Sequence, residues 1–435
     1  MSEREPIGVV GVGWVGLVTA ACFAELGHPV IARDIAAEKV EALGRGELTI
    51  HEPGLPDLIS RNAERLAFTT EIGPLLDAAR ILFVCVDTPP TPSGDADLSR
   101  VRSVVEEMGS GDGHVLVMKS TVPAGTGGLI RRDLPGTAYV SCPEFLKEGS
   151  AVEDFMHPDR VVIGVDAGDQ EAGDRVAELY RPLGGELVRT DVASAEMIKL
   201  ASNAFLATKI SFVNEIANVC EEVGADVAEV ARGMGLDSRI GPAFLRPGIG
   251  YGGSCFPKDV SALKMLAGNT GYHFQLLNAV IEVNELQKRR VVGKLQKHLG
   301  SLLGRRIALL GLAFKPDTDD MREASSLVLA ARLEGEGAEV IAYDPVAGAR
   351  AGEVLETVEI AGSALDALEG ADAAVLVTEW DEFAALDWAA AAELMAQPLI
   401  VDGRNFLDPD VLRAAGFEYE GIGRFAGATS AAGAE

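Results

Sequence analysis

Hydrophobic and polar residues follow two rhythms along the first part of the chain. Over roughly the first 190 residues, short apolar runs are separated by stretches in which apolar residues recur every three or four positions. Strands that alternate with amphipathic helices, such as Leu17–Leu26 and Ser99–Met108, predict a parallel, doubly wound sheet. The predicted strands are Ile7–Val10, Val30–Arg33, Leu66–Thr69, Ile81–Val86, Val115–Lys119, Ala138–Ser141, Arg160–Val165 and Leu187–Thr190.

The pattern changes at Ser194. Helical periodicity then runs to Val223 without a Gly or Pro. A helix of that length spans roughly 45 Å at 1.5 Å per residue, which is more than one small domain needs. We expect it to bridge two domains or to form a subunit interface. More helical pattern, broken by the Gly-rich segment Gly248–Gly253, continues to Leu299.

A second strand–helix alternation begins at Arg305 and predicts a smaller α/β sheet. We therefore expect an α/β domain over residues 1–193, a helical central domain over residues 194–300 and a second α/β domain over residues 301–435. The Ala-, Gly- and Ser-rich tail after Arg424 is expected to fray. The apolar runs of the second sheet are RRIALLGLAF, AEVIAYDP, ADAAVLVTEW and PLIVDGRN.

Composition narrows the classes of function. The chain has 48% hydrophobic residues and neither a signal-peptide pattern nor an apolar run of about 18 residues, so we expect a soluble, cytoplasmic protein that contacts no membrane. A net charge of -28 argues against nucleic acid as a partner, and means that a phosphorylated ligand would need local Lys and Arg. Five scattered Cys and six dispersed His indicate neither a disulfide framework nor a metal site.

A glycine turn joins the first predicted strand to the first predicted helix. Its sequence is Gly11-Val12-Gly13-Trp14-Val15-Gly16, and this strand–turn–helix context is the one in which such a turn binds the pyrophosphate of a dinucleotide. Asp34 ends the next strand at close to the separation expected for a ribose-binding carboxylate, which favours NAD over NADP. Arg33 weakens that preference, and the alternative is a glycine turn that binds nothing.

The segment 250–259, GYGGSCFPKD, contains a second candidate for chemistry. Gly-rich backbone lets a ligand approach, and the neighbouring Lys258 and helix N-terminus would favour a Cys255 thiolate. A thiolate in an NAD enzyme suggests a thiohemiacetal that becomes a thioester, whereas an isolated cysteine would usually be an inert core thiol. Lys199 and Asn203 share a helix face but fit solvation equally well. Glu144 and Thr121 follow predicted strands, where either a site or an ordinary surface would suit them.

Together these strings resemble the UDP-glucose/GDP-mannose dehydrogenase family from about Ile7 to Asn405. Several such strings in the same order are far more specific than any one of them. The markers are GVGWVGLVTAACFAELGH, EPGL (52–55), DTPP (87–90), KSTVP (119–123), PEFLKEG (143–149), the Lys199/Asn203 helix, GYGGSCFPKD (250–259), GLAFKPDTDDMREA (311–324) and DGRN (402–405).

The resemblance implies a role for each chemical group. Cys255 would be the nucleophile, and Lys199 with Asn203 would stabilise negative charge on the substrate oxygen. Asp259 and Thr121 would position water, and Glu144 would be the general acid/base of thioester hydrolysis. The expected NAD site comprises Gly11, Gly13, Val15, Gly16, Asp34, Lys39, Thr88, Thr121, Glu148, Lys258 and Arg322. The expected substrate site comprises Phe145, Leu146, Lys147, Lys199, Asn203, Arg239, Phe244, Gly252, Lys315 and Arg404.

The resemblance also implies an architecture and a substrate. It predicts two Rossmann-like doubly wound domains joined by a helical central domain with a long helix, and a homodimer in which Arg239 reaches the neighbouring subunit. The expected reaction is the NAD-dependent four-electron oxidation of UDP-glucose to UDP-glucuronate. The alternatives are GDP-mannose or a UDP-N-acetylhexosamine as substrate, a single-hydride hydroxyacid dehydrogenase, or a non-catalytic nucleotide-binding paralogue. The sequence departs from the family's usual residues at Trp14, Arg33 and Cys142.

Overall fold

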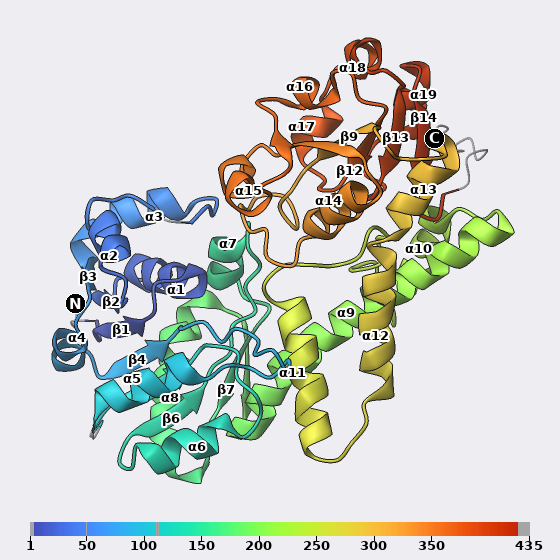
Figure 1. The fold of residues 1–435 in the computed structure, drawn as a ribbon. Coiled ribbons are helices and arrows are strands. Elements are labelled where there is room, and N and C mark those ends of the chain that lie inside the picture. Colours follow the sequence, from blue (N-terminus) through green and yellow to red (C-terminus); the bar gives the residue numbers. More distant parts are fainter. Residues whose placement is uncertain (1–3, 49, 110, 112, 425–435) are drawn as a thin grey trace. The chain divides into compact units, whose positions relative to one another are not determined.

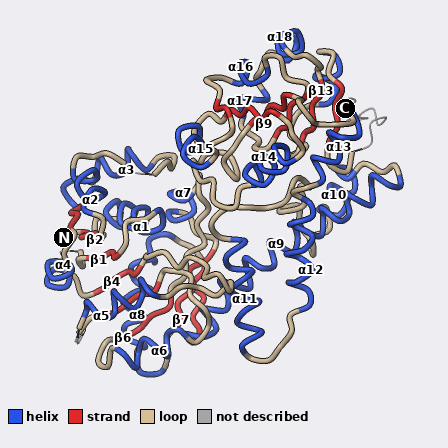
Figure 2. The backbone as a smooth tube through the Cα atoms, in the orientation of Figure 1, coloured by secondary structure: helices blue, strands red, loops and turns tan. Residues whose placement is uncertain are grey.

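The computed structural model describes residues 4–48, 50–109, 111 and 113–424 of the chain. The chain divides into two compact units: unit 1 contains residues 1–202 and 261–273, and unit 2 contains residues 203–260 and 274–435. Each is built around its own parallel α/β sheet (Figures 1 and 2). The tail after Arg424, where we expected fraying, lies outside the described residues.

Unit 1 contains an eight-stranded sheet in the order β3-β2-β1-β4-β5-β6-β7-β8. All eight strands predicted from the apolar runs are present; four have the predicted bounds, and the other four differ at one end by one or two residues. Most of these strands are short, almost uninterrupted apolar runs, because a parallel sheet is covered on both faces and side chains on either face are buried. The strands are β1 (Ile7–Val10), β2 (Val30–Arg33), β3 (Leu66–Thr69), β4 (Ile81–Val84), β5 (Val115–Met118), β6 (Ala138–Ser141), β7 (Arg160–Gly164) and β8 (Glu186–Thr190).

Successive strand residues of unit 1 enter two separate cores, as the period of two requires. Ile81 and Phe83 of β4 face one core and Leu82 and Val84 face the other. The first core is covered by α1 (Trp14–Glu25), α2 (Ala37–Gly44), α3 (Leu55–Arg61), α7 (Ala151–Met156) and α8 (Gln170–Tyr180). The second is covered by α4 (Ile72–Ala78), α5 (Ser99–Met108), α6 (Thr126–Asp133) and the start of α9 (Val192–Val223). Short 3-10 turns span Ala63–Arg65, Ala167–Asp169 and Arg181–Leu183.

One strand pair departs from the predicted parallel arrangement. β7 runs antiparallel to β6, with Ser141 opposite Gly164, while β7 and β8 are parallel to each other. A connection between antiparallel neighbours begins and ends at the same edge of the sheet. The segment between β6 and β7, which contains Glu144 and Lys147, therefore stays at the carboxyl edge.

The predicted long helix is present as α9 (Val192–Val223), a single element of 32 residues. Its first part belongs to unit 1 and the remainder to unit 2, which agrees with the expected bridging role. The division into three domains, with boundaries after residues 193 and 300, stays a prediction. Four further helices follow α9 in the sequence and precede the strands of the second sheet: α10 (Val227–Gly235), α11 (Phe256–Asn269), α12 (Gln275–Gln287) and α13 (Arg290–Leu299).

Unit 2 contains a six-stranded parallel sheet in the order β11-β10-β9-β12-β13-β14. Four strands match the predicted runs: β9 (Arg306–Leu310), β10 (Glu339–Tyr343), β12 (Ala373–Leu376) and β13 (Leu399–Asp402). The edge strands β11 (Glu359–Ile360) and β14 (Glu418–Gly421) were not expected, because one is very short and both are rich in Glu. The helices that accompany this second sheet are α14 (Ser325–Gly335), α15 (Gly348–Val354), α16 (Ala364–Leu368), α17 (Asp381–Ala384), α18 (Trp388–Leu394) and α19 (Pro409–Ala414).

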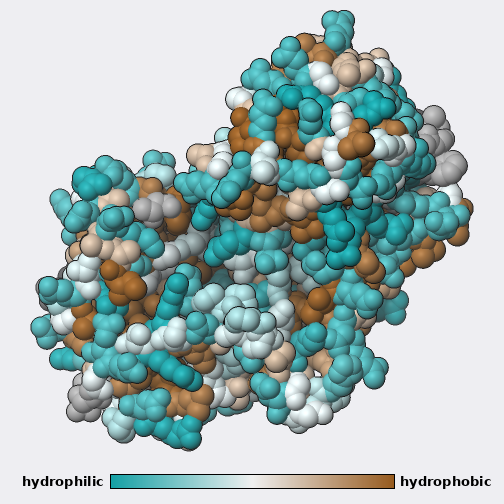
Figure 3. Space-filling model, viewed as in Figure 1, coloured by the Kyte–Doolittle hydropathy of each residue, from teal (hydrophilic) through white to brown (hydrophobic). Residues whose placement is uncertain are grey.

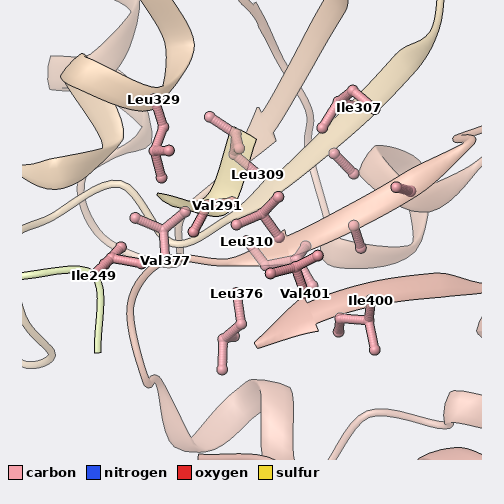
Figure 4. Close-up of a cluster of buried hydrophobic side chains, with 14 of the residues drawn as sticks. Ile249, Val291, Ile307, Leu309, Leu310, Leu329, Leu376, Val377, Ile400 and Val401 are labelled. Atoms are coloured by element: carbon pink, nitrogen blue, oxygen red, sulfur yellow. The ribbon is translucent and has the colours of Figure 1, made fainter. Parts of the chain in front are cut away.

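The core of unit 2 includes residues that precede its sheet in the sequence. Figure 4 shows Ile249 and Val291 beside Leu310 of β9 and Val377, which follows β12. Burial of Ile249 matters for the site because it anchors the Gly-rich segment that leads to Cys255. On the face drawn in Figure 3, hydrophilic side chains predominate and apolar patches lie between them. None of the helices in the described ranges combines the length and apolarity needed to cross a membrane.

Candidate functional site

The glycine turn of unit 1 has the geometry of a phosphate-binding loop. Gly11 has φ +92°, and a Cβ there would lie 2.9 Å from the Cys85 carbonyl oxygen; a Cβ on Gly16 would lie 1.8 Å from the Gly11 oxygen. These two glycines are therefore required by the turn and by helix–strand packing. A Cβ on Gly13 would meet only Asp87 Oδ1, at 3.8 Å. The space beside Gly13, next to a helix N-terminus with no side-chain cap, fits a pyrophosphate.

Asp34 lies directly after β2, where a ribose would reach it. One carboxylate oxygen accepts a hydrogen bond from Val12 N at 2.9 Å and lies 3.7 Å from Lys39 Nζ. The other oxygen accepts from Ala36 N at 3.0 Å. Asp34 thus ties the glycine turn to the second strand, and its side chain is only partly buried.

Arg33 does not have the role that its position beside Asp34 suggested. Its side chain is buried, with Nε donating to the Thr70 carbonyl at 3.1 Å and Nη2 donating to Glu107 of α5 at 2.5 Å. The guanidinium group is therefore held by unit 1 itself. These two contacts argue against Arg33 as a partner for a 2′-phosphate.

Glu52 is a site residue that sequence reasoning missed, although the EPGL string contains it. Its buried carboxylate accepts from Trp14 Nε1 at 2.9 Å, from Gly149 N at 2.8 Å and from Ala151 N at 2.8 Å. It therefore connects the glycine turn to the PEFLKEG segment. Trp14, listed above among the departures, uses its indole N–H in this connection.

The other predicted NAD residues of unit 1 lie around the same sheet edge. Thr88 is buried and donates through Oγ1 to the Thr121 carbonyl at 2.8 Å, which joins the segments after β4 and β5. Val15 belongs to the first turn of α1. Glu148 is half-buried in the PEFLKEG segment. The carboxyl ends of parallel strands are where an open α/β sheet places its ligands.

Glu144 and Lys199 form a buried ion pair in unit 1. Lys199 Nζ lies 2.7 Å from Glu144 Oε1, and the two side chains are 4% and 6% exposed. Glu144 Oε2 also accepts from Leu146 N at 2.6 Å. Burial raises the pKa of Glu144, but the charge and hydrogen bond of Lys199, the Leu146 N–H and the charge of Lys119 together hold this pKa below its usual range. Solvation, the default alternative for Lys199, does not apply.

The segment after Glu144 lines a pocket of about 180 Å³ in unit 1. Phe145, Leu146 and Lys147 all line it, and the Arg160 guanidinium lies 3.8 Å from the centroid of the Phe145 ring. Lys147 pairs with Asp154 at 3.0 Å. The predicted substrate residues of this segment therefore line one pocket. Arg160 is an additional cation of that pocket that the sequence patterns did not single out.

Cys255 lies in unit 2 immediately before α11. Its carbonyl accepts the amide hydrogen of Asp259 at 2.9 Å, so the residue begins the first turn of that helix. The thiol is only half-buried, and Ser254 Oγ lies 3.6 Å from Sγ. The described Cys22, Cys85, Cys142 and Cys220 are all buried. A helix N-terminus stabilises a thiolate, which makes Cys255 the cysteine best suited to nucleophilic attack.

Asn203 and Asp259 are brought together within unit 2. Asn203 Nδ2 donates to Asp259 Oδ2 at 2.6 Å, and Lys258 Nζ lies 2.8 Å from Asp259 Oδ1. Asp259 is 1% exposed. Because Asn203 follows Lys199 by one helical turn of α9, both side chains leave the same face of that helix. Among the described residues, no group of His, Cys, Asp and Glu could hold a metal ion.

The fold itself requires the glycines before Cys255. A Cβ on Gly252 would lie 2.2 Å from the Glu323 carbonyl oxygen, and one on Gly253 would lie 2.7 Å from the Phe314 ring. Packing of the chain against itself excludes a side chain at both positions, and the expected approach of a ligand to this backbone stays a prediction. Arg404 joins the same assembly, donating to the carbonyls of Val377, Gly250 and Phe314 at 2.7, 3.2 and 3.2 Å.

Four further residues of unit 2 were predicted for the NAD or substrate site: Arg239, Phe244, Lys315 and Arg322. Lys315 Nζ lies 5.4 Å from the Phe314 ring centroid, and Arg322 forms a bidentate pair with Asp320. Phe244 has φ +63°, which is uncommon for a bulky residue and typical of functional segments. Arg239 is 87% exposed and pairs with Asp237 at 2.6 Å.

Comparison with known proteins agrees with this geometry along the whole chain. Residues 5–184, 193–286 and 308–409 match the NAD binding, central and UDP binding domains of the UDP-glucose/GDP-mannose dehydrogenase family. The UDP-glucose 6-dehydrogenase TuaD of Bacillus subtilis is 46% identical over 96% of this chain and 93% of that protein. The UDP-glucose 6-dehydrogenase of Pseudomonas aeruginosa is 47% identical over 96% of this chain and 97% of that protein.

A solved structure is similar in fold as well. The UDP-glucose dehydrogenase of the hyperthermophilic archaeon Pyrobaculum islandicum superposes with a TM-score of 0.91 at 36% identity, covering 97% of this chain and 98% of that one. NAD is accordingly the cofactor, and unit 1 contains its binding domain. The chain is an NAD-dependent oxidoreductase that belongs to the UDP-glucose/GDP-mannose dehydrogenase family.

Proposed function

We propose that this protein oxidises the C6 hydroxymethyl group of UDP-glucose to a carboxylate, using NAD, and releases UDP-glucuronate. The observation that carries the proposal is the placement of Cys255 at the start of α11, one turn before Asp259 and its partner Asn203. Relatives at 46% and 47% identity over nearly the whole chain are UDP-glucose 6-dehydrogenases. A simple alcohol dehydrogenase needs no nucleophilic cysteine, whereas a cysteine at this position can carry the oxidation on to the acid through a thioester.

Cys255 supplies the covalent steps. The glycine turn would hold NAD, which would supply the hydride acceptor; the two oxidations reduce two molecules of NAD, one hydride each. The Cys255 thiolate adds to the aldehyde carbon, and the resulting thiohemiacetal loses the second hydride to become a thioester. Water then attacks the thioester carbon, the C–S bond breaks, and the thiolate and the carboxylate product are released. Four electrons leave the sugar, two with each hydride.

Lys199 and Asn203 stabilise the oxygen bonded to the reacting carbon. That oxygen develops negative charge as an alkoxide and again in the thiohemiacetal, and an ammonium group and an amide N–H are suited to it. Glu144, kept ionised by its surroundings, takes a proton from the attacking water. Asp259 and Thr121 position that water. The charge on Lys199 therefore serves Glu144 in the resting protein and the substrate oxygen during turnover.

Local basic residues bind the nucleotide part of the substrate. The chain has a net charge of -28, so a diphosphate is held only where Lys and Arg gather. Lys147 in unit 1 and Lys315 in unit 2 are candidates with flexible side chains. We assign Phe145, Leu146, Phe244, Gly252 and Arg404 to the remaining contacts.

The number of NADH molecules formed per limiting UDP-glucose tests the reaction. With excess NAD, absorbance is expected to report two NADH per sugar, because each hydride transfer reduces one NAD. One NADH per sugar would mean that oxidation stops at the aldehyde, and the thioester role of Cys255 would be wrong. No NADH with UDP-glucose, but NADH with GDP-mannose or a UDP-N-acetylhexosamine, would transfer the proposal to that substrate.

Replacing Asp34 tests the NAD site. We expect Asp34→Ala to weaken NAD binding by about 1–3 kcal/mol, because it removes both the ribose contact and the hydrogen bond from Val12 N. Titration calorimetry with NAD measures the change. Lys264→Ala, at an exposed position of α11, is the control and is expected to bind NAD normally. An unchanged affinity in Asp34→Ala would remove Asp34 from the site.

We further propose a homodimer formed through unit 2. Phe205, Phe212 and Val219 recur every seven residues along α9 and are 65%, 51% and 56% exposed. Leu276 and Leu286 of α12 are 57% and 53% exposed. Large apolar side chains gathered on one helix face favour a partner, and Arg239 is free of the core and suited to contact a neighbouring subunit.

We expect Phe212→Asp to shift the sedimentation coefficient from dimer to monomer; a wild-type monomer would contradict the proposal.

A further inference from the structure

Lys119 is a buried cation that the reaction sequence above does not use. It follows β5 directly, is 4% exposed and lines the same 180 Å³ pocket as Glu144. Its Nζ lies 5.5 Å from the ring centroid of Tyr180 and 5.8 Å from that of Phe155. Within the described residues, no hydrogen-bond acceptor or carboxylate is in contact with this ammonium group. Two aromatic faces compensate only part of the cost of burying a charge.

The sheet places Lys119 and Glu144 beside each other. Met118 and Ser141 are paired neighbours on β5 and β6, and Cys142 N donates to the Met118 carbonyl at 2.9 Å. Lys119 and Glu144 therefore leave the sheet at the same edge, on adjacent segments. Asp154, which also lines the pocket, is paired with Lys147. Glu144 is the fully buried carboxylate that the Lys119 charge can stabilise, and that charge lowers its pKa.

The other titratable groups around this pair are neutral, already engaged or, in the case of Asp159, exposed to solvent. Burial raises the pKa of the Cys142 thiol and, to about 12, that of the Cys85 thiol, and it raises the pKa of the Tyr180 hydroxyl as well. It raises the pKa of Cys22 on α1 likewise. At the rim of the pocket, Arg160 stacks on Phe145, His157 pairs with Glu153, and Asp159 is exposed. Glu144 therefore faces two buried positive charges, Lys199 and Lys119.

We propose that Lys119 is a positioning residue that keeps Glu144 ionised when Lys199 is engaged by the substrate oxygen. This inference rests on the proposed function, in which Glu144 is the base of thioester hydrolysis. Once Lys199 turns its charge to the substrate, a buried carboxylate with no other cation would take up a proton. Among the residues that the structure describes, no carboxylate or other acceptor competes for the Lys119 ammonium group, so its charge stays with Glu144 throughout the cycle.

The test compares Lys119→Met with Lys119→Arg. Glu144 acts as a base only when it is ionised, which is above its pKa. Loss of a nearby cation raises that pKa, so on lowering the pH the variant loses its base at a higher pH than the wild type does. In Lys119→Met we expect the acidic limb of the kcat–pH profile to move up by about one pH unit. Below that limb, intact-mass analysis of quenched samples is expected to show accumulated thioester on Cys255, with an unchanged burst of NADH. Lys119→Arg restores the wild-type limb, and Lys264→Met, an exposed lysine, leaves it unmoved.

Two outcomes overturn the inference. One is an acidic limb of Lys119→Met at the wild-type pH. The other is an arginine variant as impaired as the methionine variant, which would indicate that the Lys119 side chain acts only through its packing and not through its charge. If the methionine variant does not fold, Lys119→Gln makes the same comparison with a polar side chain. Glu144→Gln separates this inference from the function it rests on. Absence of thioester in Glu144→Gln defeats the proposed hydrolysis, whereas thioester there but none in Lys119→Met defeats only the role of Lys119.

Discussion

Replacing Cys255 by serine is expected to abolish formation of the uronate. A serine hydroxyl is not ionised at neutral pH and cannot form the thioester from which the acid is released, so kcat for the complete oxidation should fall by a factor on the order of 10³ or more. The first hydride transfer does not need the thiol, and some aldehyde-level or ester-like species is expected to accumulate. Chromatography of the sugar products, with intact-mass analysis of the protein, measures both effects.

Cys220→Ser provides a matched control for this variant. Cys220 is buried in unit 2 near the C-terminal end of α9 and is not one of the predicted site residues, so the same chemical change there is expected to affect stability only and to leave two NADH per sugar. Oxidation to the uronate at the full rate by Cys255→Ser would show that the reaction does not pass through this cysteine. That result would leave the assignment of the glycine turn and Asp34 to NAD unchanged, because both lie in unit 1.

Replacing Lys199 by methionine is expected to reduce both stability and activity. Its ammonium group lies 2.7 Å from Glu144 Oε1 with both side chains almost fully buried, and loss of one partner of a buried pair costs about 3–5 kcal/mol. Lys119 offsets part of that loss. Turnover should fall by a factor on the order of 10²–10³, because the cation that stabilises the substrate oxygen is also lost. Urea unfolding and NADH formation measure the two effects separately.

A double variant distinguishes the two roles of Lys199. Lys199→Met combined with Glu144→Gln removes both charges, so it should regain much of the lost stability while staying inactive. Wild-type stability in Lys199→Met would contradict the ion pair. Reduced stability with full turnover would contradict the oxyanion role and leave Lys199 as a structural partner of Glu144.

Features that depend on neighbouring residues could be predicted from the sequence. The strand–turn–helix context of the glycine turn and the position of Asp34 follow from local backbone geometry, and both are found where they were predicted. The parallel strands were recognisable because burial on both faces demands continuous apolar runs. The edge strands of the second sheet were missed because β11 has two residues and β14, EYEG, lacks such a run.

Side-chain partners far apart in the sequence could not be predicted from patterns. Arg33 was expected to weaken the preference for NAD, and nothing in its surroundings in the sequence shows that Glu107, on α5, holds its side chain in the interior. Nothing in the EPGL string shows that Glu52 accepts hydrogen bonds from both the glycine turn and the PEFLKEG segment. The Gly-rich string before Cys255 does not show that Glu323 and Phe314 pack against Gly252 and Gly253.

The sequence by itself determined the fold class, the NAD turn, the long helix and the identities of the chemical groups, because these depend on residue type and short-range spacing. Only the tertiary structure decided their electrostatic state. Glu144 and Lys199 are 55 positions apart, and Asn203 and Asp259 are 56 positions apart, yet each pair is in direct contact. A carboxylate is stabilised in a protein interior only by cations and N–H groups placed within a few ångströms of it. Those neighbours, Lys199 and Lys119 for Glu144, come from different strands and helices that only folding brings together.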